Sequence, residues 1–261
     1  MNAISRYRLL GCEIDGLTQS DLNALVREAV ESGRSTIVAN HNLHSVHSFL
    51  KDRKMQAFYT KADYTVVDGM SLIILGRLLG LPLKRAHRLA MLDILGPIFA
   101  EAAQKGWRIF HLGNTVAVCR QGAARLQAHY PGLQVQTEHG YFDVTPGSDD
   151  NRKVLEKIHG FRPNILLVGM GMPRQESWIV DHLDQLSGMV ILNVGAYLGY
   201  VAGDIPTAPR WLGRIGLEWL FRLCTEPARL GRRYLIEPWI VLSLLLQQGN
   251  RKLPTPEDKT S

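Results

Sequence analysis

The chain has 261 residues, of which 46% are hydrophobic and 21% are charged, and this composition excludes a disordered protein. Its 30 lysines and arginines outnumber its 24 aspartates and glutamates, and the resulting net charge of +6 indicates an anionic partner. Three widely spaced cysteines exclude a disulfide framework and a four-cysteine zinc site, so we expect a reducing, cytoplasmic environment.

Strand-like and helical segments alternate along the chain. The first residues lack the apolar segment of a signal peptide, so we expect none. The expected strands are Ser35–Asn40, Tyr64–Asp68, Arg108–Leu112, Leu133–Thr137, Ile165–Gly169 and Met189–Val194. The expected helices are Asp21–Ser32, Leu43–Tyr59, Met70–Leu79, Met91–Lys105, Val116–His129, Asp150–His159 and Gln175–Leu186. The chain contains no run of about 18 apolar residues, so we expect no membrane-spanning helix.

Several of the expected strands are continuously apolar, as parallel strands are when helices cover both faces of a sheet. Strands and helices that alternate through short links are typical of α/β proteins. The sequence therefore predicts an α/β fold with a mostly parallel, Rossmann-like sheet and helices on both of its faces. We expect the ligand site at the carboxyl ends of the strands.

From residue 205 onward, arginines and aromatic residues are interleaved. The segment between Pro209 and Tyr234 contains six arginines and two glutamates, so it accounts for +4 of the net charge of +6. Pro227 and Pro238 are expected in the first turns of new helices, where proline is tolerated. We therefore divide the chain into an α/β body at residues 1–204, a basic helical appendage at residues 205–249 and a polar tail at residues 250–261.

Polar residues stand at the ends of two neighbouring predicted strands. Asp68 ends one strand, where a carboxylate would face a ligand, although it could instead cap the following helix. Asn40 and Asn42 end the other strand, and two amides at this spacing can bind a polyhydroxylated ligand. Asn42 could equally be only the N-cap of the helix that follows.

Three histidines, His41, His44 and His47, lie close together in the sequence. On a helix, steps of three residues spread such side chains over about 120° of the surface. No acidic residue or cysteine nearby in the sequence completes a ligand set. We therefore predict neither a metal site nor a cofactor here.

A glycine-rich segment, Gly169–Glu176, directly follows an apolar strand. The amides of Gly169 and Gly171 could face an anion at the start of a helix, and Gln175 could point back toward the same site. Pro173 interrupts the spacing of a dinucleotide-binding fingerprint, which argues against that motif.

Two further loops are expected at the same edge of the sheet. Gly195 and Gly199 follow the next strand and predict a flexible loop, and Gly140 and Tyr141 belong to another loop in which the aromatic ring could stack on a base. The chain contains no Asp-x-Asp pair, no Gly-x-Ser-x-Gly elbow and no P-loop. These absences argue against a metal-dependent sugar transferase, a serine hydrolase and a nucleoside triphosphatase.

The segments LVGMGMPRQESWI, HGYFD, VGAYLGYVAG and APRWLGRIGLEWLFRLCTEPARLGRRYL, which span about Asn40 to Tyr234, resemble the WecG/TagA/CpsF glycosyltransferases. The resemblance implies an inverting transfer of a sugar from a UDP-sugar to an undecaprenyl-diphosphate-linked sugar at the cytoplasmic face of the inner membrane. It also implies a role in teichoic acid, common antigen or exopolysaccharide synthesis, without a metal ion. Residues 1–105 would then serve the acceptor, and residues 106–204 the nucleotide sugar.

Individual positions match motifs of this family. Asp68 matches the proposed catalytic base in an Asp-Gly motif, and Asn42 matches the asparagine of a Thr-x-Asn motif. Asn40 stands where that motif has threonine. Arg88 matches the arginine of a Glu-Arg-Val-like segment, and Gln175 matches the glutamine of a Pro-(Lys/Arg)-Gln-Glu motif.

Two motifs of the family are altered in this chain. Gly195–Gly199 replaces a Gly-Gly-Ala-Phe-Asp loop without its aspartate, and Thr207–Pro209 replaces Arg-Ala-Pro. Such departures affect the identity of the sugar more than the reaction. N-acetylmannosamine, its uronic acid and glucose are the candidate donor sugars, and the departures favour a glucosyltransferase of exopolysaccharide synthesis.

The appendage is expected to contact lipid. The resemblance implies that arginines of this segment meet the diphosphates or the anionic membrane surface; they are Arg214, Arg222, Arg229, Arg232 and Arg233. The apolar run Tyr234–Leu246 is too short to span a bilayer and is typical of a helix in the membrane interface. We expect no nucleic-acid partner, and a homo-oligomer is compatible with the sequence.

Two alternative functions remain at this point. A nucleotide-dependent oxidoreductase would suit the predicted sheet, although its fingerprint and its ribose-binding acid are missing. The arginine-rich segment alone would also suit a basic peripheral module that binds a membrane or a nucleic acid. Binding of UDP separates these alternatives, because a pure membrane module should not bind it.

Overall fold

The computed structural model describes residues 4–209, 212 and 217–248. Within these residues, six parallel strands form one sheet in the order β4-β3-β8-β7-β5-β6. Their bounds are β3 Thr36–His41, β4 Tyr64–Val67, β5 Arg108–Gly113, β6 Gln134–Glu138, β7 Ile165–Gly169 and β8 Val190–Asn193. The predicted α/β fold with a parallel sheet is therefore confirmed.

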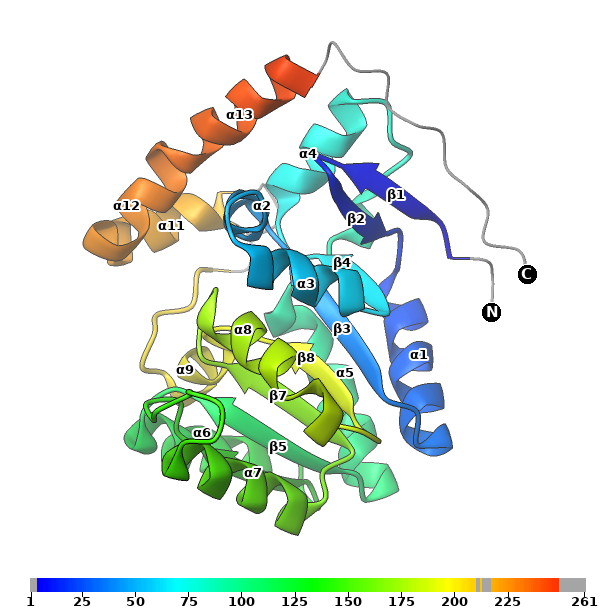
Figure 1. Cartoon of the computed structure of the whole chain (residues 1–261), viewed down its shortest axis with the longest axis vertical. Helices are drawn as coiled ribbons and strands as arrows, with labels where there is room; N and C mark the ends of the chain where they lie inside the picture. The colour runs from blue at the N-terminus through cyan, green and yellow to red at the C-terminus, as the bar shows by residue number, and fades with distance from the viewer. Residues whose placement is uncertain (1–3, 210–211, 213–216, 249–261) are drawn as a thin grey trace.

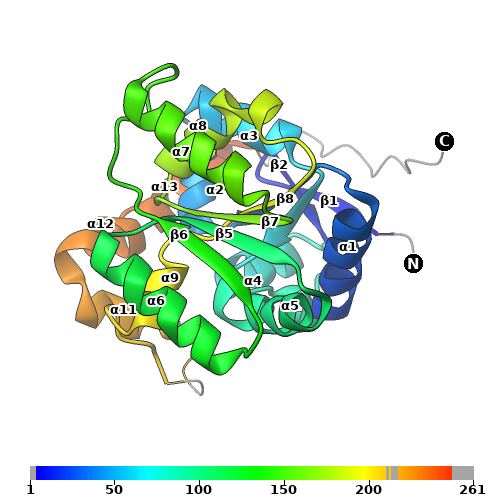
Figure 2. The same ribbon diagram turned by 90° about the horizontal axis from the view of Figure 1, so that it is seen from below.

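Helices cover both faces of this sheet (Figures 1 and 2). One face packs against α1 (Gln19–Ser32), α5 (Met91–Lys105), α6 (Val116–His129) and α9 (Tyr197–Ala202), and the other packs against α3 (Arg53–Lys61), α7 (Asp149–Phe161) and α8 (Arg174–Asp181). Successive strand residues belong to opposite cores, as Ile109 and Phe110 do, because side chains alternate along a strand. Both faces of these strands are therefore buried, which is why the strand sequences are continuously apolar.

A short hairpin that was not predicted from the sequence precedes the sheet. Strands β1 (Arg6–Leu9) and β2 (Cys12–Asp15) pair antiparallel with each other. The buried carboxylate of Asp15 accepts a hydrogen bond of 2.7 Å from the amide of Thr65 and pairs with Arg6 at 2.8 Å. These contacts tie the hairpin to β4, whose carboxyl end contributes to the site described below.

Two expectations about the helices were wrong. The helix predicted over Leu43–Tyr59 is divided into α2 (Leu43–Phe49) and α3, because Asp52 caps α3 by accepting hydrogen bonds from two of its first amides. The flexible loop predicted around Gly199 instead contains α9. Helix α4 (Met70–Leu78) was expected, and single 3₁₀ turns cover Arg85–His87 and Leu183–Gln185.

The chain ends in α11 (Glu218–Thr225), α12 (Pro227–Leu235) and α13 (Glu237–Gln248). As predicted, Pro227 begins a helix and Pro238 lies in the first turn of the next. Figure 1 places these helices near α2 and α4, beyond the carboxyl ends of the strands. None of the described helices has the length and apolar character needed to cross a membrane. Arg214 and the polar tail at residues 250–261 lie outside the described residues.

Candidate active site

A cavity of about 1150 Å³ opens at the carboxyl ends of the strands, between the sheet and the C-terminal helices. Every residue that the sequence predicted as catalytic or substrate-binding lines it: Asn40, Asn42, Asp68, Arg88, Gly140, Tyr141, Gly169, Gly171, Gln175 and Gly195. Parallel strands explain this convergence, because their carboxyl ends meet at one edge of the sheet. The cavity is large enough for a nucleotide and part of a second substrate.

Asp68 stands at the point where the chain leaves β4. Its amide donates a hydrogen bond of 2.8 Å to the carbonyl oxygen of His41, which fixes the backbone beside β3. The alternative role as a helix cap is not what the structure shows, because Gly69 is the N-cap of α4 and no side chain caps this helix. The carboxylate of Asp68 lines the cavity instead.

The two asparagines have structural partners as well as positions in the cavity. Asn42 caps α2 by accepting from the amide of Ser45 at 3.1 Å, and its side-chain oxygen also accepts from Arg233 at 3.3 Å. The amide of Asn40 donates to the side-chain oxygen of Asn193 at 2.9 Å, and its own side chain donates back to the Asn193 carbonyl. These hydrogen bonds join the end of β3 to β8, to α2 and to Arg233.

Gln175 lines the cavity and also holds the neighbouring loops together. Its side chain is fully buried, and its oxygen accepts hydrogen bonds of 3.2 Å from the amides of both Gly171 and Gly195. Its nitrogen donates to Glu176 at 2.7 Å. The Gly171 amide was expected to face an anion, but in the structure it donates to Gln175. Gln175 instead joins the loops that follow β7 and β8.

Glycines bring the neighbouring loops into backbone contact. A Cβ atom at Gly169 would lie 2.6 Å from the carbonyl oxygen of Gly195, and one at Gly113 would lie 2.3 Å from the carbonyl oxygen of Gly169. Any larger residue would force these loops apart. The floor of the cavity is consequently formed by closely packed main chain.

Arginines supply most of the positive charge of the cavity. Those that line it among the described residues are Arg85, Arg88, Arg174, Arg222, Arg232 and Arg233. Burial lowers the pKa of Arg233, whereas Tyr234, and more weakly Asp68, raise it. Within the described part of the chain, the Nε atom of Arg233 is buried without a hydrogen-bond acceptor. An arginine so placed is a suitable partner for an anionic ligand.

Some residues of the cavity were not predicted from the sequence. Asn114 directly follows β5 in a left-handed conformation, with φ of 62°, and its buried side-chain nitrogen has no acceptor among the described residues. Arg174 donates to the carbonyl oxygens of Gly140 and Phe142 at 3.0 and 2.6 Å and so positions their loop. Asn114 could have been found from the sequence, because it is a polar residue that follows a predicted strand. The partners of Arg174 could not, because they are carbonyl oxygens of a loop distant in the sequence.

We predicted no metal site at the histidines because no acidic residue lies near them in the sequence, but folding brings a distant glutamate to His44 and His47. Glu237, from the first turn of α13, lies 2.8 Å from His44 and 3.8 Å from His47. His41 is separate from this group: it ends β3, stacks on Tyr59, and burial lowers its pKa to about 3. A ligand set that the sequence did not reveal therefore exists at the cavity wall.

Comparison with known proteins matches residues 7–254 to the family described as "Glycosyl transferase WecG/TagA/CpsF family". Similar proteins include the N-acetylglucosaminyldiphosphoundecaprenol N-acetyl-beta-D-mannosaminyltransferases of Staphylococcus aureus strains NCTC 8325 and COL. Each is 27% identical to this chain over 230 residues, which cover 87% of this chain and 88% of the relative.

Proposed function

The chain belongs to the WecG/TagA/CpsF family of glycosyl transferases, and from this membership we propose that it transfers a sugar from a UDP-sugar to a sugar carried on undecaprenyl diphosphate. The acceptor is suggested by the names of the staphylococcal relatives. The observation that best supports the proposal is that Asp68 lines a large cavity together with a cluster of arginines. Membership of this family argues against the oxidoreductase alternative.

The two substrates are assigned to opposite sides of the cavity. The donor nucleotide is placed over the loops after β5, β6 and β7, where Asn114 offers an unused amide and Tyr141 is 74% exposed. An exposed aromatic ring at this position can stack on a base. The acceptor sugar is placed near the ends of β3 and β4, beside Asn42 and Asp68.

In the proposed reaction, Asp68 is the general base. The acceptor oxygen attacks the anomeric carbon from the face opposite UDP, and its proton passes to the Asp68 carboxylate as the new C–O bond forms. The bond from the anomeric carbon to UDP breaks, and its electron pair leaves with the diphosphate. Attack from the opposite face inverts the configuration of the anomeric carbon.

Arginines are proposed to stabilise the leaving diphosphate. Arg88 and Arg233 both line the cavity, and Arg233 contacts Asn42 close to the proposed acceptor position. Guanidinium groups bind phosphate oxygens with two parallel hydrogen bonds, which neutralises the developing charge without a cation. The absence of an Asp-x-Asp pair from the whole sequence is consistent with this arrangement.

The proposed donor sugar is N-acetylmannosamine. The sequence departures favoured glucose, but the relatives that cover 87% of this chain are named mannosaminyltransferases. UDP-glucose is therefore kept as the competing donor in the test. The pathway is proposed to be the synthesis of a cell-surface polymer that begins on undecaprenyl diphosphate.

A donor screen tests this function. Purified full-length protein is incubated with a short-chain polyprenyl-diphosphate N-acetylglucosamine and, separately, with UDP-N-acetylmannosamine, UDP-glucose or UDP-N-acetylglucosamine, and products are detected by mass spectrometry. We expect a product with one added N-acetylmannosamine. A product formed only from UDP-glucose would contradict the proposed donor, and no product from any UDP-sugar would contradict the proposed reaction.

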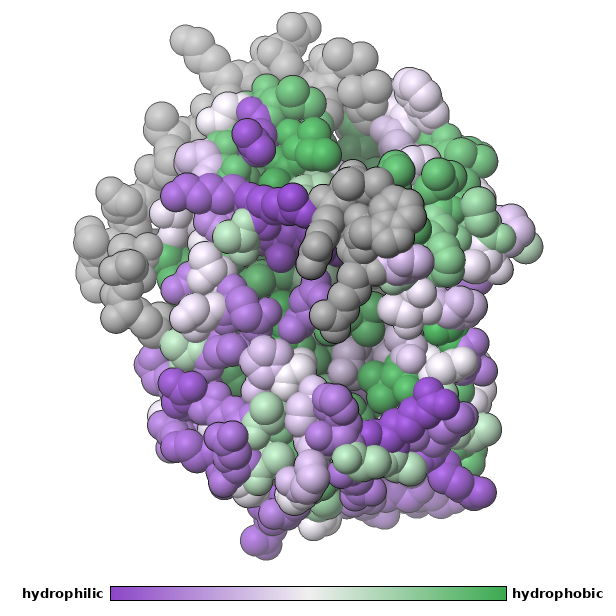
Figure 3. Space-filling model, turned by 180° about the vertical axis from the view of Figure 1, so that it is seen from behind, coloured by the Kyte–Doolittle hydropathy of each residue, from purple (hydrophilic) through white to green (hydrophobic). Residues whose placement is uncertain are grey.

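The C-terminal helices are proposed to bind the surface of the membrane that holds the acceptor. Apolar side chains exposed at this end of the protein include Ile74, Leu78, Trp219, Leu235, Ile236 and Trp239. Figure 3 shows hydrophobic residues gathered at the upper end of the molecule, which carries α4 and the C-terminal helices. Trp239 is 70% exposed, and tryptophan is enriched at membrane interfaces.

Vesicle binding tests this surface. The double change Arg229→Gln and Arg232→Gln should weaken binding to anionic vesicles and reduce its salt dependence, because each arginine near such a surface contributes about 1 kcal/mol. The control removes the same charge from two exposed arginines of the body, Arg34 and Arg120. Equal binding by the two double variants would contradict an arginine-mediated contact.

A further inference from the structure

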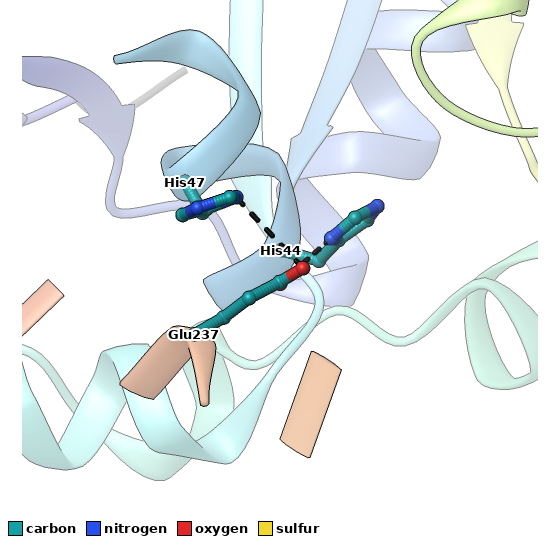
Figure 4. Close-up of side chains that lie close together, drawn as sticks. All are labelled: His44, His47 and Glu237. Carbon is teal, nitrogen blue, oxygen red and sulfur yellow. Dashed lines mark hydrogen bonds and ion pairs between the residues drawn. The ribbon is translucent and has the colours of Figure 1, made fainter. Parts of the chain in front are cut away.

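Two histidines and one glutamate converge where α2 meets α13 (Figure 4). His44 and His47 come from α2, one turn apart, and Glu237 comes from the first turn of α13. The Nδ1 atom of His44 lies 2.8 Å from one carboxylate oxygen of Glu237, and the Nδ1 atom of His47 lies 3.8 Å from the other. One potential ligand atom from each residue lies within 4.8 Å of the others.

The surroundings of this cluster are those of a binding site rather than of a surface ion pair. Glu237 is only 5% exposed, and His47 is 8% exposed. The contact between Glu237 and His47 is too long for a hydrogen bond. A buried imidazole and a buried carboxylate that face each other at this distance are spaced as two ligands of one ion are, rather than as a hydrogen-bonded pair.

We propose that His44, His47 and Glu237 bind a divalent transition-metal ion, for which zinc is the best match. Imidazole nitrogens and a carboxylate oxygen are ligands that zinc takes at about 2.0 to 2.2 Å. In a tetrahedral site, ligand atoms at these lengths are about 3.3 Å apart, which lies between the two separations seen here. Small side-chain rotations therefore bring all three atoms to one ion.

Binding would replace the hydrogen bond between His44 and Glu237. His44 would bind through Nδ1 and carry its ring proton on Nε2. His44 and Glu237 also line the cavity. A water molecule from the cavity could therefore complete the coordination of the ion.

The proposed role of the ion is to fasten the C-terminal helices to the body. His44 and Glu237 are 193 residues apart in the sequence. The ion would join α2, which begins next to Asn42, to α13, which follows the helix that carries Arg232 and Arg233. This site is separate from the proposed sugar transfer, because it holds the arginines in place and takes no part in bond formation.

Metal content tests the proposal directly. The full-length protein, produced without a histidine tag, is dialysed against a buffer that holds free zinc at about 1 µM and analysed by mass spectrometry of the metal. We expect about one zinc ion per chain. The double variant His44→Gln/His47→Gln should lose this ion, and Glu237→Gln should bind it at least about tenfold more weakly.

A matched control is His139→Gln. His139 also lies beside a carboxylate, 3.5 Å from Glu138, but belongs to no cluster of ligands among the described residues. This variant should bind zinc like the unchanged protein. If the unchanged protein retains no more zinc than the double variant, the cluster is a hydrogen-bonded contact only and the metal site is wrong.

Limited proteolysis provides a second measurement that does not depend on activity. Zinc should slow tryptic cleavage within α12 at least about fivefold in the unchanged protein and in His139→Gln, because the ion holds the following helix against α2. It should have no such effect on the double variant or on Glu237→Gln. Zinc binding without any protection of α12 would overturn the proposed fastening role.

Discussion

Replacement of Gln175 by alanine should destabilise the protein and disrupt the cavity floor. The change removes the acceptor of two backbone amides, those of Gly171 and Gly195, and a hydrogen bond to Glu176. Each amide left without a partner costs about 1 to 3 kcal/mol, and water can reach both partly exposed glycines. The expected loss in the free energy of unfolding is therefore about 3 to 4 kcal/mol.

Urea unfolding, followed by circular dichroism, measures this loss. With a slope of about 3 kcal/mol per M, the midpoint should fall by about 1 M. The control is Gln104→Ala, at an exposed helical position, which should change the free energy by less than about 0.5 kcal/mol. If the two alanine variants unfold at the same urea concentration, Gln175 does not join the loops as described.

Burial raises the pKa of Glu176 above its ordinary value of 4.5, so the folded protein binds the carboxyl proton more tightly than the unfolded chain does. The free energy of unfolding therefore falls as pH rises from about 4.5 through the folded-state pKa. Glu176→Gln should therefore gain stability relative to the unchanged protein between pH 5 and pH 8 in urea unfolding; a constant difference contradicts this. Arg233→Gln should lower kcat at least about tenfold, because this arginine is proposed to stabilise the leaving diphosphate and its buried Nε lacks an acceptor among the described residues. The exposed control Arg152→Gln should keep the kcat of the unchanged enzyme; equal kcat values for the two variants would exclude Arg233 from stabilising the diphosphate. After chelator treatment and reloading with zinc, the enzyme should show the same transfer rate with and without added Mg²⁺ or Mn²⁺, since no Asp-x-Asp pair exists. A rate raised by either added ion would contradict arginine-based stabilisation.

The main sheet could be predicted because its strands are buried on both faces. Ile165–Gly169 is observed with the predicted bounds, and the other strands differ by a residue or two. The N-terminal hairpin could not be predicted in the same way. Its strands have four residues each, and they are held by contacts from Asp15 to Thr65 and from Arg6 to the carbonyl oxygen of Asp63, which are distant in the sequence.

The candidate site could be predicted as far as topology determines it. A parallel sheet brings every strand end to one edge, so Asp68 and Gly169 had to lie at the same edge of the sheet once the strands were identified. The partners of individual side chains are a different matter. The two amides held by Gln175 and the approach of Glu237 to His44 depend on how separate loops and helices pack. No local pattern in the sequence encodes such contacts.

The rate of sugar transfer by Asp68→Asn tests the central claim most directly. The asparagine keeps the shape of the side chain but cannot accept the proton of the acceptor hydroxyl, so kcat should fall at least about a hundredfold. Asp204→Asn, at another acidic position of the cavity wall, is the control and should retain most of the activity. UDP binding, measured by calorimetry, should be unchanged in both variants. A kcat near that of the unchanged enzyme in Asp68→Asn, with UDP still bound, would contradict the proposed mechanism.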